Sequence, residues 1–209
     1  MLIERMGDGQ LVAIYIKGSF VRREMNERSD VDMVPIVTKN IFAKPAWRLN
    51  IPELHPVVTT PLSLEEFEQN RLATKDDQPY DFRSKPDSFL RFIKDYKLVY
   101  GKAVNPKLYP IRNDNVMFED ELKIIRQMVP LLEKGEINFG VTLKEFFWMT
   151  EMELAVNGIQ VPHTLVGIAK GTDKDHLVQE ALRLRQKGQL DKTTELVFVN
   201  KLREYLATK

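Results

Sequence analysis

The hydrophobic positions of the N-terminal half form short runs that are typical of β-strands. Residues 10–17 (QLVAIYIK) are rich in β-branched and aromatic side chains and end at Gly18, which predicts a buried strand. Residues 30–37 (DVDMVPIV) predict a second strand, residues 54–60 a third, and residues 97–100 a short fourth one. Because polar and helical segments separate these runs, we expect strands and helices to alternate through this half.

Helical patterns lie between the strand-like runs. Residues 20–28 are polar and rich in arginine and predict a short helix, and residues 88–96 carry apolar side chains at helical spacing. Residues 62–72 include Ser63 followed three positions later by Glu66, which is the pattern of a capping box. This pattern predicts that a helix begins directly after Ser63.

The C-terminal half shows helical periodicity alone. Apolar residues recur at steps of three and four through residues 118–132. Thr142 and Glu145 form a second capping-box pattern ahead of another apolar segment. Two further helices are expected at residues 173–187 and 191–207.

The change of pattern divides the chain into two predicted domains. Residues 1–110 predict an α+β domain with a mixed β-sheet and flanking helices, and residues 111–209 predict an all-α helical bundle. Hydrophobic residues make up 43% of the chain and charged residues 29%, which is ordinary for a globular protein with a real core.

Composition excludes several classes of function. Lysine and arginine number 31 against 30 aspartate and glutamate, so the net charge of +1 disfavours extended nucleic-acid binding. The chain has no cysteine, which removes disulfides, thiolate catalysis and cysteine-bound zinc and favours a reducing cytoplasm. No stretch approaches the ~20 apolar residues of a membrane span, and we expect no membrane partner.

Two short motifs carry the candidate chemistry. Gly18-Ser19 follows the first strand, and after nine further residues Ser29-Asp30-Val31-Asp32 begins the second. Side chains alternate faces along a strand, so Asp30 and Asp32 should project to the same side. Two carboxylates that point together repel unless a cation neutralises them, and Mg²⁺ suits oxygen ligands of this kind.

The segment between these motifs supplies candidate phosphate contacts. Gly18 lacks a Cβ and allows a ligand to approach the backbone, while Ser19 can donate to a phosphate oxygen. Arg22 and Arg23 would add the planar donors that suit phosphate, although a solvated role is equally open for both. An anion cradle beside a pair of metal-binding acids together indicate a nucleoside triphosphate site.

This arrangement resembles the nucleotidyltransferase superfamily, whose members share the DNA polymerase beta type fold. The family carries Gly-Ser at the end of a strand, a short helix and Asp-x-Asp on the next strand. Gly18, Ser19, Asp30 and Asp32 match this pattern at the usual separation, and Ser29 precedes the acids as it commonly does.

The resemblance covers residues 10–104, and the strand at residues 97–100 is similar to the one that closes the sheet in many small members. The later helices are similar in kind to the bundles appended to aminoglycoside nucleotidyltransferases. The resemblance implies transfer of a nucleoside monophosphate, AMP from ATP or its equivalent from another triphosphate, to a hydroxyl of a small molecule or protein. Pyrophosphate would leave, and Asp30 and Asp32 would hold two Mg²⁺ ions.

One departure from the family pattern concerns the third carboxylate, which members usually carry on a following strand. The matching stretch here offers Glu53 or His55, which alternation would place on one face of the predicted strand. Members also often draw a general base from the helical domain. The candidates there are Glu145, Glu151 and Glu153.

The uncertain third carboxylate leaves a second function open. The chain could be a non-catalytic nucleotide-binding module, similar to the nucleotidyltransferase-like antitoxins that pair with helical toxins. A homodimer or a toxin-like protein partner therefore remains an alternative. An RNA-tailing enzyme is a weaker option, because the balanced charge offers no basic track for a polynucleotide.

Overall fold

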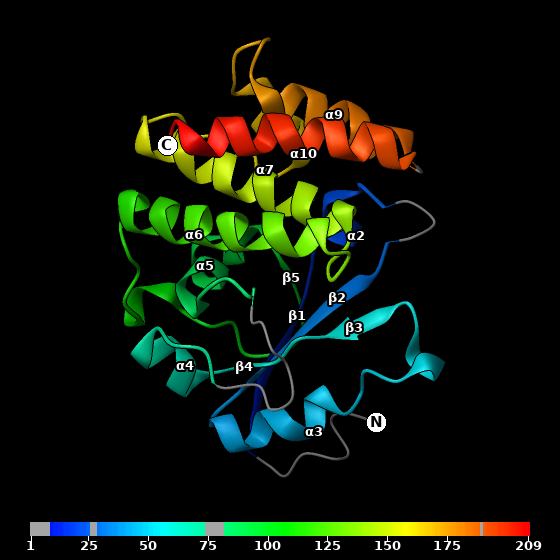
Figure 1. Cartoon of the computed structure of the whole chain (residues 1–209). Helices are drawn as coiled ribbons and strands as arrows, with labels where there is room; N and C mark the ends of the chain where they lie inside the picture. The colour runs from blue at the N-terminus through cyan, green and yellow to red at the C-terminus, as the bar shows by residue number, and fades with distance from the viewer. Residues whose placement is uncertain (1–8, 26–28, 74–81, 189) are drawn as a thin grey trace. The chain divides into compact units, whose positions relative to one another are not determined.

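The computed structural model describes residues 9–25, 29–73, 82–188 and 190–209 (Figure 1). The chain divides into two compact units, Met1–Ile111 and Arg112–Lys209. The first contains a mixed β-sheet with helices, and the second contains helices among its described residues. The predicted α+β fold class is confirmed.

Within the described residues, the sheet of the first unit has five strands. In chain order they are β1 (Leu11–Lys17), β2 (Val31–Val37), β3 (Val57–Thr59), β4 (Leu62–Ser63) and β5 (Lys97–Gly101). The spatial order is β3-β2-β1-β5, and β4 also pairs with β2. Strand β1 runs antiparallel to β2 and β5, whereas β3 and β4 run parallel to β2. The register places Lys17 opposite Asp32, so the end of β1 meets the start of β2.

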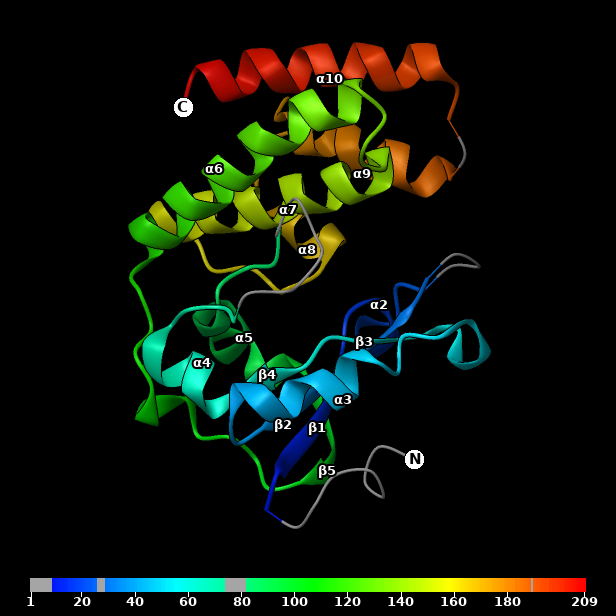
Figure 2. The ribbon, with the colours of Figure 1, turned by 60° about the horizontal axis from the view of Figure 1, so that its bottom comes forward.

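Alternation along the strands separates two small cores on the two faces of the sheet. Ala13 and Tyr15 pack with Val34 and Ile36 against the helices α4 (Leu64–Gln69) and α5 (Pro86–Arg91). On the opposite face, Ile14 packs with Val37 and with α3, which spans Ala43–Trp47 (Figures 1 and 2). The central parts of β1 and β2 are therefore packed on both faces, whereas β5 is exposed along its length.

The local signals for helices in this unit succeed in one place and fail in another. The Ser63 hydroxyl accepts the Glu66 N–H at 3.0 Å, and the Glu66 carboxylate accepts the Ser63 N–H at 2.7 Å, so the predicted capping box is confirmed. The helix expected at residues 20–28 is shorter: α2 spans Ser19–Arg22, and residues 26–28 lie outside the described part of the chain. Arg23 ends α2 with a left-handed backbone at φ 58°.

The predicted third strand is also shorter than expected. Strand β3 spans only residues 57–59, and Pro52–Leu54 form a 3₁₀ helix instead. Short 3₁₀ helices also span Asn40–Phe42, Ile93–Asp95 and Pro106–Leu108.

The second unit packs five described helices around one apolar core. They are α6 (Asp114–Glu133), α7 (Phe139–Val156), α8 (Leu165–Lys170), α9 (Leu177–Lys187) and α10 (Lys192–Ala207). The core includes fully buried side chains from α7, α8, α9 and α10, namely Phe146, Phe147, Ile168, Val178, Phe198 and Leu202. None of the helices in the described ranges is both long and apolar enough to cross a membrane.

The start of α7 differs from the sequence prediction. Thr142 and Glu145 do not form a capping box, because the helix begins at Phe139 and the Asn138 side chain accepts the Gly140 N–H at 2.7 Å. Both residues lie inside the helix and are buried. Apolar packing therefore carries the helix past the point at which the local pattern predicts its start.

Candidate functional site

The turn that follows β1 is built around Gly18. Its φ of +81° lies in the region that glycine adopts readily, and it serves as the N-cap of α2. A Cβ at this position would lie 2.0 Å from Oδ2 of Asp32. The Asp32 carboxylate therefore lies directly against the Gly18 backbone, and a side chain at this position would strain the backbone and displace that carboxylate.

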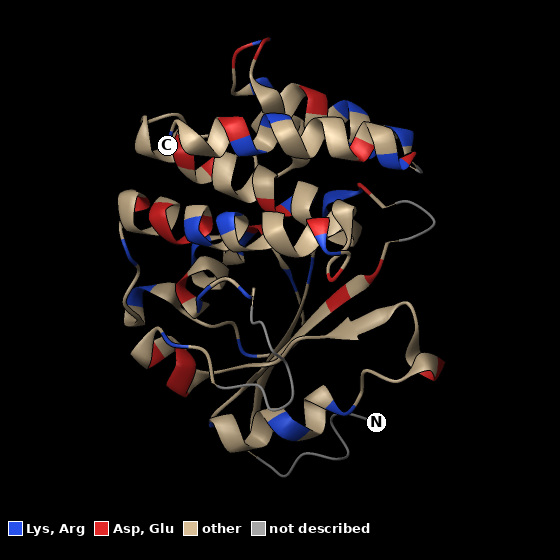
Figure 3. Ribbon diagram, in the orientation of Figure 1, with Lys and Arg blue, Asp and Glu red and all other residues tan. Residues whose placement is uncertain are grey.

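The two acids of the Asp-x-Asp motif lie at the start of β2. Asp32 is the second residue of β2, and Asp30 is the residue directly before the strand begins. The backbone between the two acids is hydrogen-bonded to the segment before β3, since the Val31 N–H donates to the Pro56 carbonyl at 2.8 Å. Figure 3 shows acidic residues at and just before the start of β2, in a strand that is otherwise uncharged.

Alternation assigns the Asp32 side chain to one face of the sheet. Asp32 has the same parity as Val34 and Ile36, which pack on the α4 and α5 side, whereas Met33 packs on the α3 side. Asp32 is half-buried, and the Asp30 side chain is 50% exposed. The acidic end of β2 is therefore accessible to a charged ligand.

The residues expected to replace the third carboxylate do not share a strand. Glu53 lies in the 3₁₀ helix before β3 and His55 caps its end, so the prediction that alternation places both on one strand face is wrong. His55 nevertheless lies near the acids, with its Nε2 3.9 Å from Oδ1 of Asp30. Strand β3 carries no acid, and its Val58 is the residue in register with Asp32.

The candidate phosphate-binding residues differ in their surroundings. Ser19 is the first residue of α2 and is half-buried, and Ser29 is half-buried beside Asp30. The Arg22 side chain is only 9% exposed, and its Nε donates to the Glu24 carboxylate at 2.7 Å. Arg23 is exposed. Of the two arginines, Arg23 is the one presented to solvent.

The donor set at the start of β2 suits a divalent cation. Asp30 and Asp32 supply carboxylate oxygens, which are the ligands that Mg²⁺ prefers. Across the described ranges, no group of three or more histidine, aspartate or glutamate side chains is arranged to hold a metal ion. Two carboxylates fit a Mg²⁺ ion whose remaining ligands come from water and a phosphate group.

The three glutamates considered as general bases in the helical unit all have partners within that unit. Burial raises the pKa of Glu145 well above its usual value, and a hydrogen bond to the Glu121 carboxyl raises it further. The Glu151 carboxylate contacts Nδ1 of His163 at 2.8 Å. Glu153 accepts the Tyr205 hydroxyl and pairs with Lys209.

The buried partner of Glu145 was missed in the sequence. Glu121 lies on α6 and is 6% exposed, and one oxygen of each carboxyl in this pair has no hydrogen-bond partner. A signal was present, because Glu121 follows Phe118 by three residues and precedes Ile125 by four. That spacing places an acid on the apolar face of a helix.

Comparisons with known proteins place this geometry in a known fold. No protein-family model matches the chain, and no curated protein matches it in sequence. Its structure is similar to the crystal structure of spectinomycin adenyltransferase AAD(9) from Enterococcus faecialis with ATP and spectinomycin. The TM-score is 0.58 at 14% sequence identity, and the match covers 96% of this chain and 93% of the other. The chain therefore has the nucleotidyltransferase fold, with a helical region appended to its mixed sheet.

Proposed function

We propose that this protein is a Mg²⁺-dependent nucleotidyltransferase that transfers AMP from ATP to a hydroxyl group and releases pyrophosphate. The acceptor would be a small molecule or a protein side chain. The observation that carries the proposal is the contact between the Asp32 carboxylate and Gly18, with Asp30 two residues away. In a chain with the nucleotidyltransferase fold, this contact places the turn after β1 next to the Asp-x-Asp motif.

The two acids would hold Mg²⁺ in this proposal. Asp30 is half-exposed to solvent and Asp32 lies against the Gly18 backbone, and in this proposal the oxygens of both would face the ligand. When bound, Mg²⁺ would neutralise charge on the triphosphate, which is its usual contribution to phosphoryl and nucleotidyl transfer.

The protein's own contribution would be to position the reacting groups. Ser19 and Ser29 would donate hydroxyl hydrogens to phosphate oxygens, and Arg23 would add a charged donor from the end of α2. Arg22 would do the same only after it leaves the Glu24 carboxylate. Held between the turn and the acids, the triphosphate would meet its acceptor in a fixed orientation, and positioning of this kind lowers the barrier substantially.

His55 is the candidate nearest the acids for a third role. Its imidazole is 75% exposed and lies 3.9 Å from Asp30. In this proposal it would accept a proton from the acceptor hydroxyl. Glu53 would be the alternative base, although its 3₁₀ helix separates it from the strand.

A second function is favoured by one observation: β3 carries no carboxylate at the position in register with Asp32. A nucleotide-binding module that does not transfer its nucleotide, of the antitoxin-like kind, would need only the turn and the acid pair. It would bind ATP and Mg²⁺ in the same place and would act through a protein partner.

The proposal is tested with ATP labelled at the α-phosphate, Mg²⁺ and a series of acceptors. Spectinomycin is the first acceptor, because the similar structure holds it, and a cell extract is the second. We expect a labelled product and pyrophosphate from the wild-type protein. Replacing both acids, Asp30→Asn with Asp32→Asn, should abolish both signals.

The matched control is Asp95→Asn, which removes an exposed acid from a 3₁₀ helix of the same unit. It should retain full activity, and circular dichroism should show that both variants are folded. Unchanged product formation in the double variant would overturn the assignment of the acids. Calorimetric binding of ATP without product from any acceptor would instead support the non-catalytic module.

A further inference from the structure

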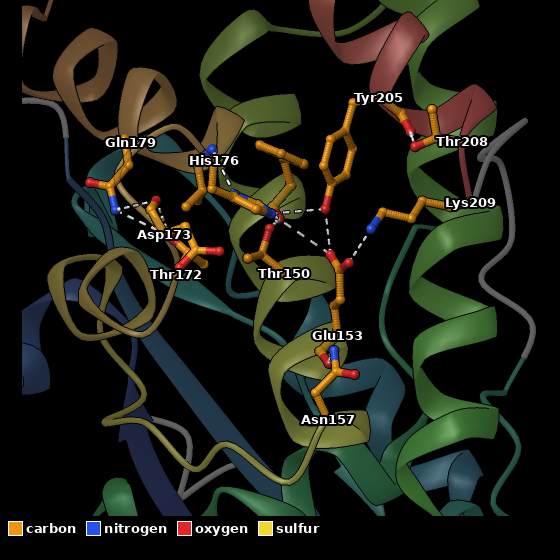
Figure 4. Close-up of polar contacts among 12 residues, drawn as sticks. Thr150, Glu153, Asn157, Thr172, Asp173, His176, Gln179, Tyr205, Thr208 and Lys209 are labelled. Atoms are coloured by element: carbon orange, nitrogen blue, oxygen red, sulfur yellow. Dashed lines mark hydrogen bonds and ion pairs between the residues drawn. The ribbon is translucent and has the colours of Figure 1, made fainter.

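A polar chain of side chains links three helices of the second unit (Figure 4). His176 is the N-cap of α9, and its Nε2 lies 2.9 Å from the Tyr205 hydroxyl on α10. That hydroxyl donates to the Glu153 carboxylate on α7, and Lys209, beyond the end of α10, pairs with the same carboxylate. These side-chain contacts therefore connect the start of α9 to the end of α10 and to α7.

The hydrogen bonds assign the proton positions on the imidazole of His176. The Val178 backbone N–H donates to Nδ1 at 3.1 Å, so Nδ1 must be unprotonated. The ring proton of the neutral imidazole therefore resides on Nε2, where it donates to Tyr205. Only this neutral tautomer satisfies both contacts, because a doubly protonated ring would turn its Nδ1–H toward the Val178 N–H.

The surroundings of His176 also favour the neutral ring. Burial lowers its pKa, and Lys209 lowers it further, against the opposing effects of Glu153, Asp173 and Asp175. The ring is stacked against Phe146, with ring centroids 6.4 Å apart, and Phe146 is fully buried. The charged groups that act on His176 are therefore Glu153 on α7, Lys209 beyond the end of α10, and Asp173 and Asp175 in the loop before α9.

We propose that His176 is an acid-sensitive latch that holds the first turn of α9 and the last turn of α10 to α7. At neutral pH the neutral imidazole caps α9 and supports Tyr205. Protonation at Nδ1 removes the acceptor for the Val178 N–H, so the first turn of α9 loses its cap and opens, whereas Nε2–H can still donate to Tyr205. The proposal concerns the helical unit alone and does not depend on the function proposed above.

The direction of the pH effect follows from the lowered pKa. The unfolded chain binds a proton at His176 near its ordinary pKa of 6.5, whereas the folded chain binds it at lower pH. The stability contributed by His176 is therefore complete above about pH 6.5 and is lost as the pH falls toward the folded pKa. The opening of α9 should follow the same titration.

The first experiment measures the tautomer and the titration of His176 in the full chain by ¹⁵N NMR of the imidazole nitrogens. We expect a protonated Nε2, an unprotonated Nδ1 and a midpoint below the ordinary histidine value of 6.5. Hydrogen exchange of the Val178 amide is then followed from pH 7.5 to 5, with correction for the intrinsic exchange rate. Loss of a helix cap predicts roughly five-fold weaker protection on the acid side.

Two variants and a control separate the latch from a general effect of acid. His176→Asn keeps a good N-cap acceptor that does not titrate, so protection of Val178 should become independent of pH. Tyr205→Phe removes the hydroxyl and should raise exchange at the end of α10 at every pH. His55→Asn, in the other unit, should leave the profile unchanged.

Three results would overturn the proposal. They are a proton on Nδ1 of His176 at neutral pH, protection of Val178 that does not change with pH in the wild type, and an unaltered acid transition in His176→Asn. If His176→Asn fails to fold, the tautomer and the wild-type exchange profile still decide the question.

Discussion

Replacing Gly18 with alanine tests the contact on which the candidate site depends. The new Cβ would lie 2.0 Å from Oδ2 of Asp32, and real Cβ contacts essentially never fall below 3.0 Å. The difference, 3.0 − 2.0, requires the carboxylate to move by at least about 1 Å. A misplacement of about 1 Å in a positioned group can reduce turnover by roughly 100-fold, which corresponds to about 2.7 kcal/mol.

Backbone strain adds a separate cost, which a matched variant isolates. Gly18 has φ +81° and Gly9 has φ +76° in the same unit, but a Cβ at Gly9 would meet no atom within 4 Å. Gly9→Ala therefore carries the strain of a left-handed residue, about 1–2 kcal/mol, without the steric clash. Gly18→Ala should lose at least this much stability, because its ψ of −160° lies in a region that only glycine adopts readily, and should in addition lose function.

The assay combines urea unfolding of both variants with ATP binding and AMP transfer. We expect Gly9→Ala to lose stability and keep its activity, and Gly18→Ala to lose both. If Gly18→Ala retained wild-type transfer and ATP affinity, the Asp32 carboxylate would not need to lie against this turn. The proposed arrangement of the site would then be wrong.

Two further predictions concern stability. The pKa of Glu145 is raised by burial and by Glu121, so its contribution to stability is lost as the pH rises from 4.5 through the folded pKa. Glu145→Gln should remove this loss and be more stable by roughly 1–3 kcal/mol in urea unfolding at pH 8.5. Parallel stability profiles of the two proteins from pH 4.5 to 8.5 would contradict the raised pKa. Ser63→Ala removes the hydroxyl that caps α4 through Glu66 and should cost about 1 kcal/mol, measured in the same way at pH 7, and an unchanged midpoint would show that the cap contributes little.

Local patterns in the sequence were sufficient for much of the first unit. The alternating and apolar runs of β1 and β2 predict strands because side chains on the two faces enter two different cores. The capping box at Ser63 is a contact between residues three apart, so it can be recognised without knowledge of the fold. The Gly-Ser and Asp-x-Asp motifs were recognisable for the same reason, because each is local.

Local reasoning failed where packing or a turn overrides the pattern. Glu53 and His55 were expected to share one face of a strand, but Glu53 lies in a 3₁₀ helix and His55 caps its end, so they lose that shared face. Thr142 and Glu145 match a capping box, yet both are buried inside α7. For Thr142 and Glu145, packing against residues distant in the chain determines where the helix begins, and a short window contains no information about them.

The amino-acid sequence was enough to establish the class of fold, the two motifs and the chemistry that they suggest. It could not establish that the Asp32 carboxylate lies against Gly18, because that contact depends on the register between β1 and β2. Nor could it pair Glu121 with Glu145, or His176 with Tyr205, since helices distant in sequence bring these groups together. Periodicity is a property of neighbouring residues, whereas a site is a property of distances in space, and only packing of the sheet and of the helices sets those distances.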